Sequence, residues 1–139
     1  MDRLYLDANV IIDYLQKRPN AKYVQNILLL AHKNQVSLIT SVLNFATIFY
    51  LEKRRGHTTK KILDRFRLIN KVISTVDQTA KSYQSALDAN FSDFEDALQY
   101  FAAVESQSNY LITNNKKDYK NSVIPVLSAK EYLLKNYEL

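Results

Sequence analysis

The stretch "RLYLDANVIIDYL", residues 3–15, joins a strand pattern to a helix pattern with an aspartate at the junction. Similar short apolar runs predict further strands at 36–40, 71–75, 109–113 and 122–126. Between most of these runs, apolar residues recur at helical spacing. Short strands that alternate with helices predict βαβ units, and therefore an α/β fold with a mostly parallel sheet and helices on both of its faces.

The composition excludes several classes of site. The 139 residues suffice for one hydrophobic core, and we expect a single domain over 1–139. The chain has no cysteine, which excludes disulfides and cysteine-bound zinc, and its only glycine, Gly56, excludes glycine-rich phosphate loops. No apolar stretch could cross a bilayer and no secretory signal is evident, so we expect a cytoplasmic protein with no membrane partner. The net charge of +5 favours nucleic acid as a partner, although a mildly basic protein of another kind would also carry it.

Asp7 directly follows the first predicted strand. Ligands of open α/β sheets bind beyond the carboxyl ends of the strands, so Asp7 is placed where a site is expected. Aspartate is also a favoured N-cap residue, and Asp7 could cap the helix that follows. Asn9 could face the same loop region. Capping and ligand roles are compatible, and the position alone does not separate them.

A second group of acids lies in "SDFEDALQYFAA", residues 92–103. Ser92 and Glu95 match a capping box, which accounts for Glu95, and Asp93 would be favoured by the helix dipole. Asp96 remains without such a role. On the residues alone a solvated helix face is the simpler explanation, and the alternative is that Asp93 and Asp96 line one cleft with Asp7.

A third polar group ends the predicted strand at 109–113. Thr113, Asn114 and Asn115 follow this strand and Asp118 lies one turn further, in a sequence that an ordinary turn would also explain. Three distant segments thus place oxygen ligands at strand ends. Carboxylates gathered in one pocket repel each other, and a hard divalent cation would relieve that repulsion.

The three segments "LDANVIIDYL", "DFEDALQYFAA" and "YLITNNKKDY" together resemble the motifs of PIN domains, small Mg²⁺- or Mn²⁺-dependent nucleases whose bacterial members include VapC toxins. The resemblance implies a three-layer fold with a central twisted parallel sheet of about five strands. It also implies that Asp7 and Asp96 are catalytic metal ligands and that Asp93 adds to them. Thr113 and Asn115 would line the cleft wall, and we expect Asn9, Thr47 and Asp118 to lie there with them.

The second PIN motif is where the chain departs from the family. A glutamate is usual in a pattern like S-x-x-x-x-x-E, and counting from Ser41 gives Thr47. Asn115 stands where aspartate is frequent, and Asp118 is offset in the fourth motif. The reduced acid set leaves two functions open, a metal-dependent ribonuclease and a PIN-like module that binds nucleic acid or protein without cutting. An unrelated doubly wound domain, such as a flavodoxin-like one, is a third alternative.

The partners implied are RNA, an antitoxin protein and a second copy of the chain, because homodimers are usual in this family. Basic residues near the motifs would contact RNA phosphates. For Arg54 and Arg55 the helix dipole is an equally good explanation. The residues expected to bind nucleic acid are Lys116, Lys117, Lys120, Arg54 and Arg55.

Overall fold

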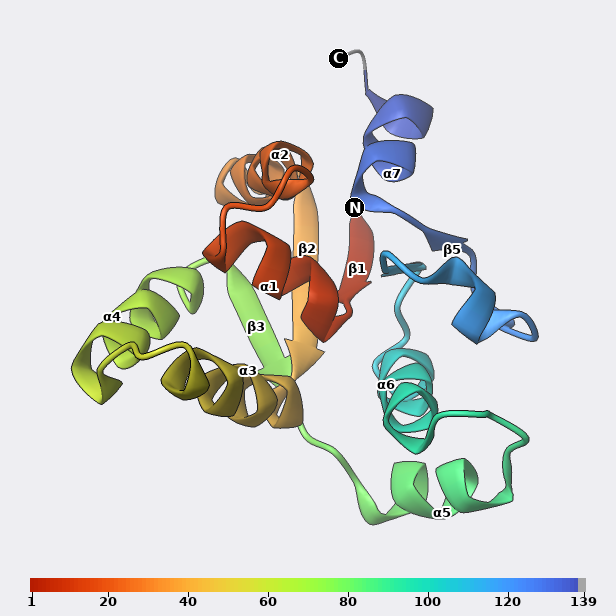
Figure 1. Ribbon diagram of the computed structural model, residues 1–139. Coiled ribbons are helices and arrows are strands. Elements are labelled where there is room, and N and C mark those ends of the chain that lie inside the picture. The colour runs from red at the N-terminus through yellow and green to blue at the C-terminus, as the bar shows by residue number, and fades with distance from the viewer. Residues whose placement is uncertain (138–139) are drawn as a thin grey trace.

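The computed structural model describes residues 1–137 and contains one five-stranded sheet in the order β3-β2-β1-β4-β5 (Figure 1). All neighbouring strands pair in parallel, as predicted. The strands are β1 (Asp2–Leu6), β2 (Val36–Ser41), β3 (Ile73–Val76), β4 (Tyr110–Ile112) and β5 (Val126–Leu127).

Helices connect the strands and cover the sheet on both sides, which gives the predicted three layers (Figure 1). They are α1 (Ala8–Leu15), α2 (Ala21–His32), α3 (Val42–Arg54), α4 (Thr59–Ile69), α5 (Ala80–Asp88), α6 (Phe94–Glu105), the 3₁₀ helix η1 (Lys116–Tyr119) and α7 (Ala129–Asn136). None of the described helices is long and apolar enough to cross a membrane.

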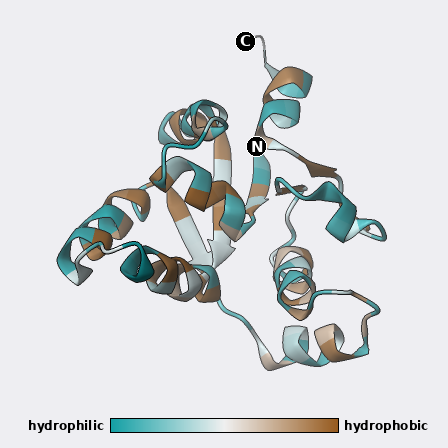
Figure 2. Cartoon of the chain, in the orientation of Figure 1, coloured by the Kyte–Doolittle hydropathy of each residue, from teal (hydrophilic) through white to brown (hydrophobic). Residues whose placement is uncertain are grey.

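The alternation of side chains along β1 divides the core in two. Leu4 and Leu6 are fully buried on the face covered by α1, α2, α3, α4 and α7, whereas Tyr5 is fully buried on the face covered by α6 and η1. The covering helices carry hydrophobic and hydrophilic residues in turn, as Figure 2 shows, which is typical of helices with one buried face. Burial on both faces fixes the register of β1, and with it the position of the residue that follows the strand.

Both ends of α3 carry residues that favour a helix end, and two predicted boundaries elsewhere differ in the structure. Ser41 caps α3, accepting a hydrogen bond from the backbone of Leu43, and Gly56 has a φ of 93° just beyond the end of that helix. The last strand was predicted at 122–126 but starts at its final residue, because Pro125 has no N–H to donate and Ser122 forms a turn instead. The expected capping box of Ser92 and Glu95 was also wrong.

The order of the strands places the end of β1 beside the end of β4. Chain connections leave β1 toward β2 and β3 on one side, and β4 and β5 lie on the other. The point where the order reverses is where ligands of such sheets bind. The backbone N–H of Asp7 donates to the carbonyl of Ile112 at 3.0 Å, so the residues after both strands meet at this point.

Candidate active site

Asp7 is buried and uses its side chain for tertiary contacts. It occupies the N-cap position of α1, but its carboxylate makes no capping hydrogen bond. Its Oδ1 accepts from Gln99 Nε2 at 2.7 Å. Its Oδ2 accepts from Thr113 Oγ1 at 2.7 Å, from Tyr119 Oη at 3.2 Å and from Asn9 Nδ2 at 3.3 Å. Four side chains thus hold one carboxylate that is 3% exposed, and Oδ1, with a single donor, keeps acceptor capacity for a ligand.

Thr113 links Asp7 to the loop after β4. The fully buried Thr113 hydroxyl donates to Asp7 and accepts from the backbone N–H of Asn115 at 3.1 Å. Asn9 Oδ1 accepts from the backbone N–H of Asn114 at 3.3 Å. The structure therefore brings Asn9, Thr113 and Asn115 to the wall of the same site, with Asn115 contributing its backbone and keeping its side chain exposed.

The acids at the start of α6 lie near enough to Asp7 for their charges to interact with it. Asp93 is the N-cap of this helix, and its Oδ1 accepts from the backbone N–H of Asp96 at 3.1 Å. Asp96 is half-buried, and burial together with the charges of Asp93 and Asp7 raises its pKa to about 7. Burial and the same two neighbours raise the pKa of Glu95. The carboxylates are close enough to repel one another.

Within the described residues this repulsion is not relieved by a basic side chain. None of the salt bridges there includes Asp7, Asp93 or Asp96. No group of three or more His, Cys, Asp or Glu side chains in residues 1–137 is arranged to enclose a metal ion. A Mg²⁺ ion needs only one or two protein carboxylates and keeps several waters, so Asp7 and Asp96 would be enough carboxylates to hold it.

Comparison with known proteins gives the family of this fold and site. The model of the PIN domain family matches residues 3–117. The chain belongs to the PIN domain family. Ribonuclease VapC1 of Aquifex aeolicus (strain VF5) is 26% identical over an alignment 137 positions long, and the alignment covers 94% of this chain and 93% of that protein.

Solved structures with the same fold agree with this assignment. VapBC2 from Rickettsia felis, bound to a DNA fragment from its promoter, has a chain that matches with a TM-score of 0.67 at 18% identity, covering 91% of this PIN domain and 97% of that chain. A toxin-antitoxin complex from Klebsiella pneumoniae matches with a TM-score of 0.65 at 17% identity, with coverages of 91% and 97%. At such identities the likeness concerns the fold.

The helix of the second motif is α3, and it contacts the residues around Asp7 through the side-chain amide of Asn44. Thr47 is half-buried on α3 and makes no side-chain hydrogen bond among the described residues, so its place in the cleft wall stays a prediction. Asn44, one turn earlier, is 2% exposed and donates from Nδ2 to Gln99 Oε1 at 2.9 Å. Glu52, further along α3, is buried against Gln16 and His57, away from Asp7.

Three residues around Asp7 were not predicted as site residues. Gln99 lies one turn after Asp96 on the same face of α6, a spacing that could have drawn attention to it. Asn44 is an amide on α3, the helix in which the family's second motif has its acid. Tyr119 is the last residue of η1, and its pKa is raised by burial and by the charge of Asp7, which keeps the hydroxyl a donor.

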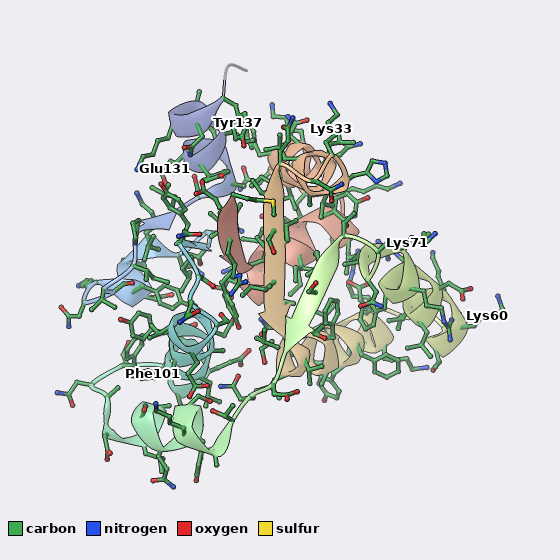
Figure 3. All side chains as sticks on the ribbon, turned by 180° about the vertical axis from the view of Figure 1, so that it is seen from behind. Lys33, Lys60, Lys71, Phe101, Glu131 and Tyr137 are labelled. Carbon is green, nitrogen blue, oxygen red and sulfur yellow. The ribbon has the colours of Figure 1, made fainter. Side chains whose placement is uncertain are left out.

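The predicted basic residues fall into two regions. Lys116, Lys117 and Lys120 are exposed on or beside η1, next to the site, and Lys116 Nζ lies 2.8 Å from Glu131 Oε2 of α7 (labelled in Figure 3). Asp118, from η1, adds to the negative charge around Asp96. Arg54 and Arg55 lie at the opposite end of α3 from Asn44.

Proposed function

We propose that this PIN domain is a divalent-metal-dependent endoribonuclease that cleaves single-stranded RNA in the cytoplasm, as the toxin of a toxin-antitoxin pair. The observation that carries the proposal is the buried Asp7 carboxylate, held by four donors beside Asp96 with no basic side chain of the described residues to neutralise the two. A structural carboxylate would be paired with a cation or left exposed. The name and coverage of the Aquifex aeolicus relative support the same activity.

In this proposal Asp7 and Asp96 hold the ion, which is Mg²⁺ or Mn²⁺, and Asp93 adds negative charge at the rim. Such an ion supplies positive charge to a phosphodiester and makes water a better nucleophile. Asp7 presents Oδ1, because Oδ2 already accepts from Asn9, Thr113 and Tyr119. The hydrogen bonds of Thr113 to Asp7 and to the backbone of Asn115 would hold the Asp7 carboxylate in this orientation when RNA binds.

RNA would be held by charge next to the site. Lys117 lies on η1 and Lys120 directly after it. Both are exposed, and neither forms a salt bridge among residues 1–137. Lys116 would exchange Glu131 for a phosphate. Contacts of this kind give affinity that is independent of sequence and sensitive to salt.

Apolar side chains exposed on the helices indicate where protein partners would bind. A groove of about 550 Å³ lies between α1, α2 and α4, and Leu29 and Leu68 on its walls are 47% and 64% exposed. An apolar segment of an antitoxin would fit it, and the Klebsiella pneumoniae neighbour is a toxin-antitoxin complex. Val42 and Tyr50 on α3 are 53% and 63% exposed, and we propose this face for a homodimer.

A second candidate function is binding of RNA without cleavage. Thr47 and Asn115 favour it, because each stands where an acid is usual in the PIN motifs. Both functions predict the same RNA affinity. Only the first predicts that the RNA is cut into fragments.

The test is incubation of purified, partner-free protein with a mixed single-stranded RNA in Mn²⁺, in Mg²⁺ or with chelator. We expect fragments with either ion, more with Mn²⁺, since it generally binds protein sites more tightly than the alkaline-earth ions. Chelator should stop the reaction. RNA that is retained by the protein but stays intact under all three conditions would support the second candidate.

A further inference from the structure

Gln99 and Asn44 form a buried chain of hydrogen bonds that ends on Asp7. Gln99 Nε2 donates to Asp7 Oδ1 at 2.7 Å, and Gln99 Oε1 accepts from Asn44 Nδ2 at 2.9 Å. Asn44 Nδ2 also donates to Thr40 Oγ1 at 2.8 Å, and the Thr40 hydroxyl donates to the carbonyl of Leu6 at 2.7 Å. The side chains are 0–4% exposed at Thr40, Asn44, Gln99 and Asp7.

The direction of every bond in this chain is fixed by its ends. The carbonyl of Leu6 and an ionised Asp7 can only accept. Thr40 must therefore give its proton to Leu6 and accept from the Asn44 amide, and Gln99 must turn its amide nitrogen toward Asp7. The Gln99 oxygen then needs a donor, which Asn44 supplies. A flipped amide at Asn44 or Gln99 would bring two acceptors together in a buried place.

The same chain ties together the three elements that shape the site. Asp7 follows β1, Asn44 lies in the first turns of α3, and Gln99 lies one turn after Asp96 on α6. The bond from Gln99 to Asp7 is thus the direct polar link between the strand that positions one acid and the helix that carries the other. Among the donors to Asp7, Gln99 alone contacts Oδ1, the oxygen with capacity left for an ion.

We infer that Gln99 is a positioning residue for the metal-binding carboxylate Asp7, and that Asn44 acts through it by fixing the orientation of its amide. The inference rests on the proposed function. In this chain α3 therefore serves the site with a hydrogen-bond donor instead of an additional acid. Residues that orient a metal ligand typically change metal affinity by about 10–100-fold when they are removed.

The experiment measures Mn²⁺ affinity of the RNA-free protein, by electron paramagnetic resonance of the free ion, together with kcat and KM for RNA. Gln99→Met keeps the size of the side chain and removes its donor, and Asn44→Met removes the support of the Gln99 amide without touching either acid. Gln78→Met is the matched control, because Gln78 is a part-buried glutamine that donates to Ser82 and to the α6 carbonyl of Leu98 instead of Asp7.

We expect Gln99→Met to weaken Mn²⁺ binding about tenfold or more and to lower kcat with little change in KM. Asn44→Met should shift both in the same direction by a smaller factor, and it carries the test if Gln99→Met does not fold. Gln78→Met should bind Mn²⁺ like the wild type, even if its Tm falls.

Wild-type Mn²⁺ affinity and kcat in a folded Gln99→Met or Asn44→Met protein would overturn the inference and leave the proposed function standing. A loss of Tm alone, without a change in Mn²⁺ affinity, would show a purely structural role and overturn it too. If the wild type itself neither binds Mn²⁺ nor cleaves RNA, the proposed function and the inference both fail.

Discussion

Thr113 Oγ1 donates to Asp7 Oδ2 at 2.7 Å, joining the ends of two neighbouring strands that are 106 positions apart in sequence. Both side chains are buried, so water cannot replace this bond. The bond exists because β1 and β4 are adjacent in the sheet, although β2, β3 and six helices separate them in the chain. It makes Thr113 a direct test of how the Asp7 carboxylate is held.

Replacement of Thr113 by valine should destabilise the protein and weaken Mn²⁺ binding. The valine fills the same space but leaves Asp7 Oδ2 without its shortest donor, which costs about 1–3 kcal/mol of unfolding free energy. Urea denaturation and Mn²⁺ titration measure the two effects. Thr113→Ser keeps the hydroxyl and is the control. Equal Mn²⁺ affinity in Thr113→Val and the wild type would show that this bond does not orient the ligand.

Asp96→Asn should raise the Tm of the metal-free protein at pH 8. The pKa of Asp96 rises from 3.8 to about 7 on folding, so between these values the folded state binds more protons than the unfolded state. Stability from this group therefore falls as the pH rises through that window, and asparagine removes the loss. Thermal scans at pH 8 and pH 5 should show a gain of a few degrees at pH 8 and a smaller one at pH 5. If Asp96→Asn had a Tm equal to or lower than that of the wild type at pH 8, the ionised Asp96 would not be destabilising the folded protein.

Two substitutions of Asp93 separate its roles as helix cap and as charge. Asp93→Ser keeps an N-cap acceptor for the Asp96 backbone, whereas Asp93→Ala removes it and should cost about 1 kcal/mol. If Asp93 also adds charge to the metal site, both variants should weaken Mn²⁺ binding by a similar factor of a few. If Asp93→Ser binds Mn²⁺ as tightly as the wild type, Asp93 acts only as the N-cap of α6.

Glu52→Ala should lower stability without changing the site. Glu52 is 1% exposed, accepts from Gln16 Nε2 at 3.0 Å, and lies 3.3 Å from His57 Nε2 and 4.0 Å from Arg65 Nη1. Its removal takes the acceptor from Gln16 and the negative charge from His57 and Arg65, at a cost of about 3 kcal/mol in urea denaturation. Glu52→Gln keeps the size of the side chain and should cost less. A change in Mn²⁺ affinity in Glu52→Ala would show that Glu52 affects the geometry of the site around Asp7.

Neutral replacement of the lysines beside the site should weaken RNA binding at every sequence. We expect Lys116→Ala, Lys117→Ala and Lys120→Ala together to make the slope of log affinity against log salt concentration less steep. The change should correspond to the loss of up to about three phosphate contacts. Arg54→Ala with Arg55→Ala is the comparison at the far end of α3. Filter binding at several salt concentrations measures both, and the reverse ranking would place the RNA on the α3–α4 side.

The sequence was informative about the sheet because its pattern is regular there. The strand after which Asp7 stands, the order of βα units and the cap at Ser41 follow from local apolar spacing and capping chemistry. The start of α6 was predicted one residue early, since Ser92 and Asp93 are both good caps and only the backbone distinguishes them. Helix boundaries are less determined by sequence than helix existence is.

The partners of Asp7 were out of reach for a physical reason. Asp7 could be placed at a strand end, but whether its side chain capped α1 or pointed to Thr113 depends on which strand lies beside β1. Gln99 and Asn44 are ordinary polar residues on two helices whose rotation against the sheet decides what they touch. Such contacts between distant segments are products of packing, and no local pattern encodes them.

The measurement that tests the central claim most directly is cleavage of single-stranded RNA in Mn²⁺ by the single variants Asp7→Asn and Asp96→Asn, compared with the wild type. Each asparagine has nearly the size of the aspartate and removes the charge that the ion requires. The account predicts that both variants fold and that each cuts at least about 100-fold more slowly. A variant that cleaves at the wild-type rate would contradict the assignment of Asp7 and Asp96 as the metal-binding acids.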